Sequence, residues 1–231
     1  MEETAEYINN MHVRTILLRK TIISRGAARA AIFMLLLIPG LAWGGLFGYR
    51  EATRDNLEIF PQWLSMLERN IHDRVPEGHC ETRMLDSCHV KHWQNFIKRI
   101  RSLPLHEQII RVNRFANQQE YILDIDNYGI EDYWATPKEF LYNNGDCEDF
   151  AITKMLTLKQ LGFDTRRMRI VVLQDTNLRI PHAVLAIDVK GDTLIMDNQI
   201  EEVVSHKHIV HYVPIYAVNE QHWWIYLPSD K

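Results

Sequence analysis

The hydrophobic pattern changes from helical to extended part-way along this 231-residue chain, and that change limits the folds open to it. Up to Gly162, apolar residues recur at the three- and four-residue spacing of amphipathic helices. We expect helices over 55–70, 90–101, 105–119 and 147–161, a short helix beginning at Thr136, and a loop over 121–133. From Arg169 onward, short apolar runs predict strands near 170–173, 183–187, 193–196, 215–218 and 223–226. Helices followed by an antiparallel sheet predict an α+β fold.

The first 49 residues differ from the rest of the chain. Five basic residues precede an uncharged stretch over 30–49, which includes an apolar run and a small-x-small sequence at Ala42-Trp43-Gly44. A basic flank followed by a short apolar run is typical of a secretory signal peptide. We therefore expect export and one globular domain over 50–231. The alternative is an uncleaved membrane anchor, although Pro39 and several glycines weaken a continuous spanning helix.

The overall charge does not favour nucleic acid as a partner. The chain carries 26 Lys and Arg against 30 Asp and Glu, a formal net charge of -4. Beyond the N-terminal region the basic residues form no continuous run of the kind that binds phosphates.

The chain has three cysteines, an odd number for an exported protein. Cys80 and Cys88 lie close together in a turn-prone segment and could form a disulfide. A zinc site with the nearby histidines is an alternative, but the spacing matches no standard zinc motif; these histidines are His79, His89 and His92. Cys147 would then remain a single thiol, for which a catalytic role is the natural explanation.

Cys147 stands at the predicted start of the strongest helix, within the sequence Gly145-Asp146-Cys147-Glu148-Asp149. Free backbone N–H groups and the helix dipole favour a thiolate there, whereas three carboxylates oppose its formation. A calcium ion held by Asp146, Glu148 and Asp149 would neutralise them, with oxygen ligands also available at Asp124, Asp126 and Asn127. The alternative is that these acidic residues only cap the helix.

His182 and Asp197 complete a candidate catalytic triad with Cys147. His182 opens one predicted strand and Asp197 closes the next. With a turn over 188–192, Ile187 faces Thr193 and His182 lies within reach of Asp197. Asp197 would then hold one imidazole nitrogen and leave the other for the thiol. The alternative is a structural histidine and an aspartate in a turn.

Three motifs together resemble the bacterial transglutaminase-like cysteine peptidases, the LapG-type periplasmic proteases. They are Asp132-Tyr133-Trp134-Ala135-Thr136-Pro137, Gly145-Asp146-Cys147-Glu148-Asp149, and the pair His182-Ala183-Val184-Leu185 and Met196-Asp197-Asn198. The resemblance implies a papain-like, transglutaminase-like fold, a Cys147, His182, Asp197 triad, and calcium bound by Asp146, Glu148 and Asp149. It also implies a substrate, a large cell-surface adhesin cut near its N-terminus beside paired alanines, whose release promotes biofilm dispersal. An inner-membrane receptor that senses cyclic di-GMP is the implied regulator.

Two other function classes share this fold. A transamidase would use the same triad to pass the acyl group to an amine instead of water. A non-catalytic binding protein would keep the fold without needing a reactive thiol.

Overall fold

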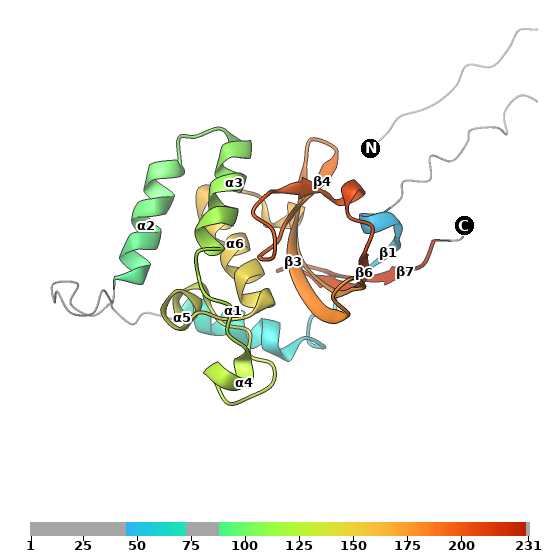
Figure 1. Ribbon diagram of the computed structural model, residues 1–231, viewed down its shortest axis with the longest axis horizontal. Helices are drawn as coiled ribbons and strands as arrows, with labels where there is room; N and C mark the ends of the chain where they lie inside the picture. The colour runs from blue at the N-terminus through green and yellow to red at the C-terminus, as the bar shows by residue number, and fades with distance from the viewer. Residues whose placement is uncertain (1–44, 73–87, 230–231) are drawn as a thin grey trace, which may run out of the picture. The chain divides into compact units, whose positions relative to one another are not determined.

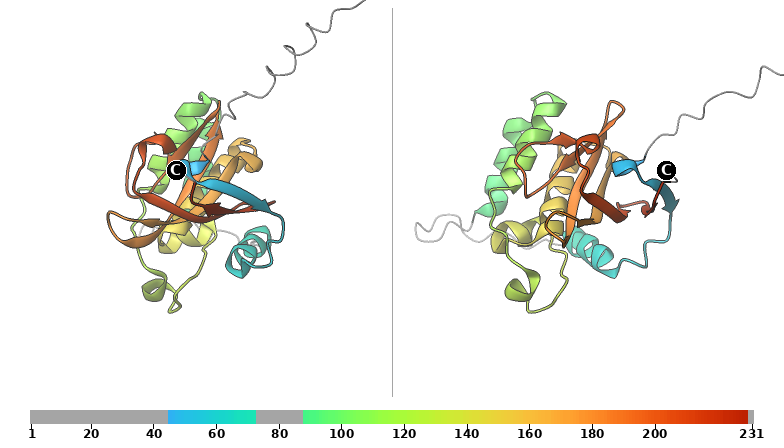
Figure 2. Two further views of the ribbon diagram at one scale, coloured as in Figure 1. Left: turned by 90° about the vertical axis from the view of Figure 1, so that its right-hand side faces the viewer. Right: turned by 45° about the vertical axis from the view of Figure 1, so that its right-hand side comes forward.

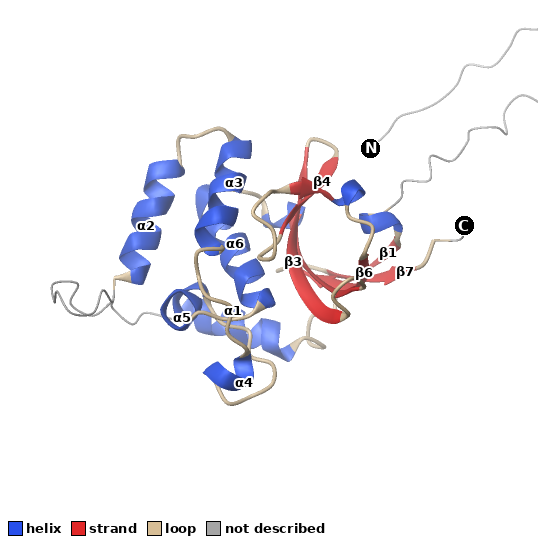
Figure 3. Ribbon diagram, viewed as in Figure 1, coloured by secondary structure: helices blue, strands red, loops and turns tan. Residues whose placement is uncertain are grey.

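Helices cover one face of an antiparallel sheet in the part of the chain that the computed structural model describes, residues 45–72 and 88–229 (Figure 1). Colouring by secondary structure separates the two layers, with the sheet strands on one side (Figure 3). This confirms the predicted α+β class. The helices are α1 (Pro61–His72), α2 (His89–Ile100), α3 (Leu105–Ala116), α4 (Asp124–Asn127), α5 (Pro137–Asn143) and α6 (Cys147–Leu161), with short 3-10 turns η1 (Leu46–Gly48), η2 (Thr165–Arg167) and η3 (His206–His208).

Two helix predictions need correction. The helix expected over 55–70 begins only at Pro61, because proline lacks the N–H that a helix interior requires and suits the first helical position. The loop expected over 121–133 contains the single turn α4. The helix predicted from the Thr136 capping box is present as α5, with the Glu139 carboxylate accepting from the Thr136 N–H at 2.7 Å.

The sheet has seven strands in the order β1-β7-β6-β2-β3-β4-β5, and all neighbouring pairs are antiparallel. The strands are β1 (Arg50–Arg54), β2 (Met168–Asp175), β3 (Ile180–Val189), β4 (Asp192–Met196), β5 (Val204–Ser205), β6 (Tyr212–Val218) and β7 (Trp223–Leu227). The predicted pairing of Ile187 with Thr193 is wrong by one residue, since Ile187 pairs with Leu194. The cause is a tighter turn than expected: Val189 already pairs with Asp192.

The main hydrophobic core lies between the helices and the sheet, around α6. On β3, Ala183, Leu185 and Ile187 face this core, while Val184 and Ala186 face the opposite side, as alternation along a strand requires. In the right-hand view of Figure 2, α6 lies between the α2–α3 pair and the strands. Every residue of α6 from Glu148 to Leu158 is buried. The helix that begins at Cys147 is therefore held on all sides.

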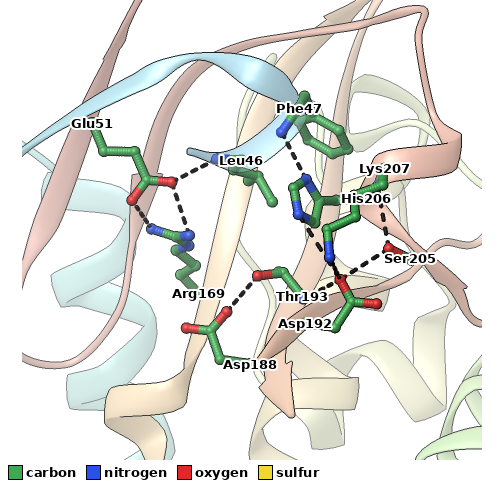
Figure 4. Close-up of polar contacts among 10 residues, drawn as sticks. All are labelled: Leu46, Phe47, Glu51, Arg169, Asp188, Asp192, Thr193, Ser205, His206 and Lys207. Carbon is green, nitrogen blue, oxygen red and sulfur yellow. Dashed lines mark hydrogen bonds and ion pairs between the residues drawn. The ribbon is translucent and has the colours of Figure 1, made fainter. Parts of the chain in front are cut away.

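A smaller core on the far face of the sheet is closed by η1. Leu46 is buried there, and the Phe47 N–H donates to His206 Nδ1 at 3.1 Å. Figure 4 shows Arg169 of β2 bound to the Glu51 carboxylate through two hydrogen bonds, of 2.8 and 3.0 Å, while that carboxylate also accepts from the Leu46 N–H. These contacts fasten the segment that leads into β1 onto the sheet.

Several predictions fall outside the described residues. They are the signal peptide or anchor up to residue 44, and the contributions of His79 and Cys80 to a zinc site or a disulfide; residues 45–49, which the prediction included in this segment, pack on the sheet as described above. Within the described ranges, no helix is long and apolar enough to cross a bilayer. In the same ranges, neither His89 nor His92 belongs to a group of side chains spaced to bind a metal.

Candidate active site

Cys147 is the first residue of α6, and local contacts fix the helix start at that position. Asp146 is the N-cap with an extended backbone, and its N–H donates to the Asp149 carboxylate at 3.3 Å. Gly145 is needed here because a Cβ atom would lie 2.1 Å from Asp149 Oδ2. The Gly-Asp-Cys-Glu-Asp sequence thus builds a tight entry into the helix with the thiol at its mouth.

Asp149 also connects this entry to the segment before α5. It is fully buried, and its second carboxylate oxygen accepts from the Ala135 N–H at 2.6 Å. Each oxygen of Asp149 therefore already holds one backbone N–H. This makes Asp149 first of all a structural acceptor that positions the start of α6.

His182 and Asp197 meet as the sequence predicts, in spite of the shifted strand register. His182 Nε2 lies 2.9 Å from Asp197 Oδ1, and both side chains are buried. The sheet pairing of β3 with β4 ends at Leu185 and Met196, so Asp197 has left the ladder and turns toward His182. The carboxylate acceptor fixes the imidazole proton on Nε2 and leaves Nδ1 as the basic nitrogen.

Tyr212 and the N–H of Gln199 complete the surroundings of Asp197. The Tyr212 hydroxyl donates to Asp197 Oδ2 at 2.5 Å, and the Gln199 N–H donates to Oδ1 at 2.9 Å. Burial would raise the pKa of Asp197, but His182 and these two donors outweigh burial and hold that pKa below its usual value. Asp197 is therefore charged at neutral pH and can stabilise an imidazolium.

Cys147 lies beside β3, the strand that carries His182, because α6 packs against this strand. The backbone N–H of Ala183, the residue after His182, interacts with the Cys147 thiol and favours its ionised form. Burial opposes ionisation of the thiol most strongly, and the negative charges of Glu148 and Asp146 oppose it further. Together they raise the pKa of Cys147 well above its usual value. Glu148 accepts a hydrogen bond from the thiol at 3.3 Å. The thiol can therefore ionise at this position only if the negative charge of the neighbouring carboxylates is neutralised.

The acidic residues around Cys147 form three overlapping groups whose ligand atoms lie within 4.8 Å of one another. Their members are Asp146, Cys147 and Glu148; Asp124, Asp146 and Asp149; and Asp124, Asp132 and Glu148. One buried carboxylate oxygen of Asp124 and one of Asp146 have no hydrogen-bond partner among the described residues. Burial raises the pKa of Asp124 to about 6, and it also raises the pKa values of Glu148 and Asp149. A hard cation with oxygen ligands fits this cluster.

The predicted ligand set changes in detail. Asp124 belongs to the cluster, whereas Asp126 is exposed and lies outside it. The Asn127 amide donates to backbone carbonyls of Asn143 and Asn144, so its role is structural. Asp132 joins the cluster without having been predicted as a ligand. Its position directly before Tyr133-Trp134 carried no spacing signal for a metal site.

Comparison with known proteins now decides the family. The family model of the bacterial transglutaminase-like cysteine proteinases (BTLCP) matches residues 73–231. The chain belongs to this family. The proteinase also resembles the solved structure of Legionella pneumophila LapG, with 30% sequence identity and a TM-score of 0.55 over 60% of this chain and 78% of LapG.

Two further LapG structures match this BTLCP proteinase in the same way. One is the calcium-bound form and the other the EGTA-treated form, each with 30% identity and a TM-score of 0.55, covering 60% of this chain and 78% and 76% of LapG, respectively. No curated protein matches the chain. Fold and family expectations are thereby confirmed, and the chain is a cysteine proteinase of the LapG type.

Proposed function

We propose that this proteinase hydrolyses peptide bonds with Cys147 as nucleophile, His182 as acid and base, and Asp197 as the group that orients His182. One observation carries the proposal: Asp197 holds the Nε2 atom of His182 at 2.9 Å, and this leaves the Nδ1 atom to act as the base. The next residue on the strand, Ala183, has its backbone N–H beside the Cys147 thiol. Burial of His182 and Asp197 protects this pair from water.

The reaction follows from these positions. The Cys147 thiol gives its proton to His182 Nδ1, and the sulfur attacks the scissile carbonyl carbon. Backbone N–H groups at the start of α6 stabilise the oxyanion. His182 then protonates the leaving amine as the C–N bond breaks and an acyl-enzyme forms. Water, losing a proton to His182, attacks the thioester and releases the acid product and the free thiol.

Calcium is the proposed resident cation, held by Asp124, Asp146 and Glu148, with Asp132 and Asp149 as further candidates. The unpartnered oxygens of Asp124 and Asp146 support the fit, as does the existence of calcium-bound and EGTA-treated forms of LapG. When bound, the ion supplies positive charge that offsets the carboxylates beside Cys147.

The biological setting is proposed from the resemblance to LapG-type proteases. We infer a periplasmic enzyme that cuts a large surface adhesin near its N-terminus and so promotes biofilm dispersal. A cyclic-di-GMP-sensing receptor of the inner membrane is the proposed regulator. The basic and apolar pattern that predicts a signal peptide or anchor in the N-terminal region supports export.

The proteolytic proposal is tested with an N-terminal fragment of a large surface adhesin from the same organism. We expect the wild-type protein to cut it and the Cys147→Ala variant to lose at least ~10³-fold in rate, as removal of a nucleophile does. Unchanged far-UV circular dichroism of the variant controls for folding. Mass spectrometry in the presence of a labelled amine separates two outcomes: free carboxyl termini support hydrolysis, whereas amine incorporation would identify a transamidase. Cleavage that survives in the alanine variant contradicts the assignment.

The calcium proposal has its own test by thermal unfolding. Calcium should raise the melting temperature by several degrees, as a ligand of the native state does, and EGTA should reverse the rise. Asp124→Asn should abolish the calcium response, because Asp124 is buried in the cluster. Asp126→Asn is the matched control, since Asp126 is exposed and outside the cluster. Equal responses of the two variants, or an equal response to magnesium, would contradict a calcium site at Asp124.

A further inference from the structure

The pair of helices α2 and α3 has a charge opposite to that of the whole chain. Residues 88–116 contain six Lys and Arg and one acidic residue, a net charge of +5 in a chain of net charge -4. In Figure 1, α2 lies on the side of the helical layer away from the strands, with α3 next to it. Their surface therefore attracts anionic groups that the rest of the molecule repels.

A groove of about 750 Å³ runs between these helices. Phe96 of α2 and Phe115 of α3 stack in it with ring centroids 4.1 Å apart, and arginines from both helices line it. These arginines are Arg99, Arg111 and Arg114. The groove thus has an apolar floor, in which Phe96 is buried, and guanidinium groups along it, which suit carboxylates because they donate two parallel hydrogen bonds.

Two of the three arginines remain available for a partner. Among the residues that the structure describes, Glu107 is the only acidic one that lines the groove, and it pairs with Arg111 at 2.7 Å. Arg99 and Arg114 are exposed, and neither forms an ion pair with any residue in 45–72 or 88–229. The groove therefore presents net positive charge.

The length of the groove favours a peptide over a small anion. Its lining on α3 extends from Glu107 to Phe115, a distance of roughly 12 Å at 1.5 Å per helical residue. An extended peptide of about four residues has this length. A membrane surface fits less well, because among the large hydrophobic residues of α2 and α3 only Leu105 is strongly exposed.

One end of the groove is joined to the segment that carries Asp197. Gln118 lines that end, and the preceding residue, Asn117, donates its amide to the Asp197 carbonyl at 2.9 Å. We propose that the groove binds an acidic, extended segment of the protein substrate, outside the bond that is cut. The inference rests on the proposed proteolytic function for the identity of the partner, while the binding itself is measurable without catalysis.

Binding is tested on the full-length Cys147→Ala protein by fluorescence anisotropy with a labelled peptide that alternates glutamate and leucine, and with its glutamine counterpart. We expect binding of the glutamate peptide that weakens with salt, and a loss of about 10-fold in affinity on adding Arg99→Glu/Arg114→Glu. The control adds Arg54→Glu/Lys190→Glu, which makes the same charge change at exposed sites outside the groove. This control should bind as before.

Equal affinity of the groove variant and the control, or equal binding of the two peptides, would overturn the proposal. The proposal would also be overturned if the protein bound vesicles containing anionic phosphatidylglycerol through the groove but did not bind the peptide. That outcome would identify a membrane surface as the partner. Circular dichroism of the groove variant confirms that the exposed substitutions leave the fold intact.

A second arm connects the groove to catalysis, with Cys147 intact. Two adhesin fragments that differ only in a glutamate or glutamine stretch beside the cut site are compared. The groove variant should lower kcat/KM for the glutamate fragment about 10-fold and leave the glutamine fragment unchanged. Equal loss on both fragments would contradict substrate binding in the groove. Absence of cleavage by every protein, wild type included, would instead refute the proposed function and leave the binding result standing.

Discussion

Lys154 places an amine in the core, two helical turns beyond Cys147 on α6. The residue is fully buried, and its Nζ has no hydrogen-bond partner among the described residues. Burial lowers the pKa of Lys154 to about 7, although the charge of Asp197 acts in the opposite direction. A neutral amine in the folded state and an ammonium in the unfolded state make stability depend on pH.

The sign of this dependence leads to a prediction for Lys154→Met. As the pH falls from 10 to 7, the unfolded chain takes up a proton that the folded chain does not, so the wild type loses stability; below pH 7 no further loss follows from this group. Lys154→Met should therefore raise the free energy of unfolding at pH 7 by on the order of 3 kcal/mol, and by less at pH 10.

Urea unfolding at several pH values measures this difference. Lys159→Met is the matched control on the same helix, since Lys159 is half-exposed and pairs with Glu220. It should change stability little at any pH. A Lys154→Met variant that is less stable than wild type at pH 7 would contradict the proposed cost of this buried amine.

Single residues of the site differ in how far the sequence reveals them. Cys147, His182 and Asp197 were predicted from a cysteine at a helix start, from a His-Asp pair on adjacent strands, and from the family resemblance, which implied the complete triad. Tyr212 and Asp132 were missed, because their closeness to Asp197 and Glu148 depends on contacts between segments far apart in the sequence.

At the scale of elements, local signals decided which boundaries could be predicted. The bounds of α6 were right, because Asp146 caps its start and Gly162 ends it in the left-handed conformation at φ 99°. Strand β1 was missed because its sequence, Arg-Glu-Ala-Thr-Arg, has no apolar alternation, and only pairing with β7 makes it a strand. Predicting the register of β3 and β4 depends on knowing the length of the turn between them. The sequence did not fix that length, and the prediction was wrong by one residue.

The attachment of η1 and β1 to the sheet depends on Arg169, which leads to a prediction at this scale. Its side chain is 12% exposed, pairs with Glu51 and lies over the Trp224 ring at 5.1 Å. Arg169→Met should lower the free energy of unfolding by roughly 2–3 kcal/mol, because it leaves Glu51 partly buried without its counter-charge. Urea unfolding measures the change.

Arg166→Met is the control for this prediction. Arg166 also pairs with an acidic residue, Asp164, but at the surface, where its side chain is 69% exposed. Removing this surface ion pair should lower the free energy of unfolding by less than about 1 kcal/mol. If the two variants lose equal stability, the Arg169–Glu51 contact does not fasten the N-terminal segment.

At the scale of the whole molecule, the helical layer and the sheet have separate tasks in the proposed site. The helical layer supplies Cys147 and most of the acidic cluster, while the sheet supplies His182 and Tyr212, and the residue directly after β4 supplies Asp197. The α+β class and the family followed from the sequence. The exact ligand cluster and the basic groove between α2 and α3 did not, because both arise only when distant segments pack together.

The central claim is that His182 activates Cys147, and the rate at which iodoacetamide alkylates Cys147 tests it most directly. With calcium present, mass spectrometry should show rapid modification of Cys147 in the wild type and in His222→Ala, which removes an exposed histidine paired with Asp55. In His182→Ala the rate should fall by about 10²-fold or more, as loss of a general base does. Equal rates in wild type and His182→Ala would contradict the account.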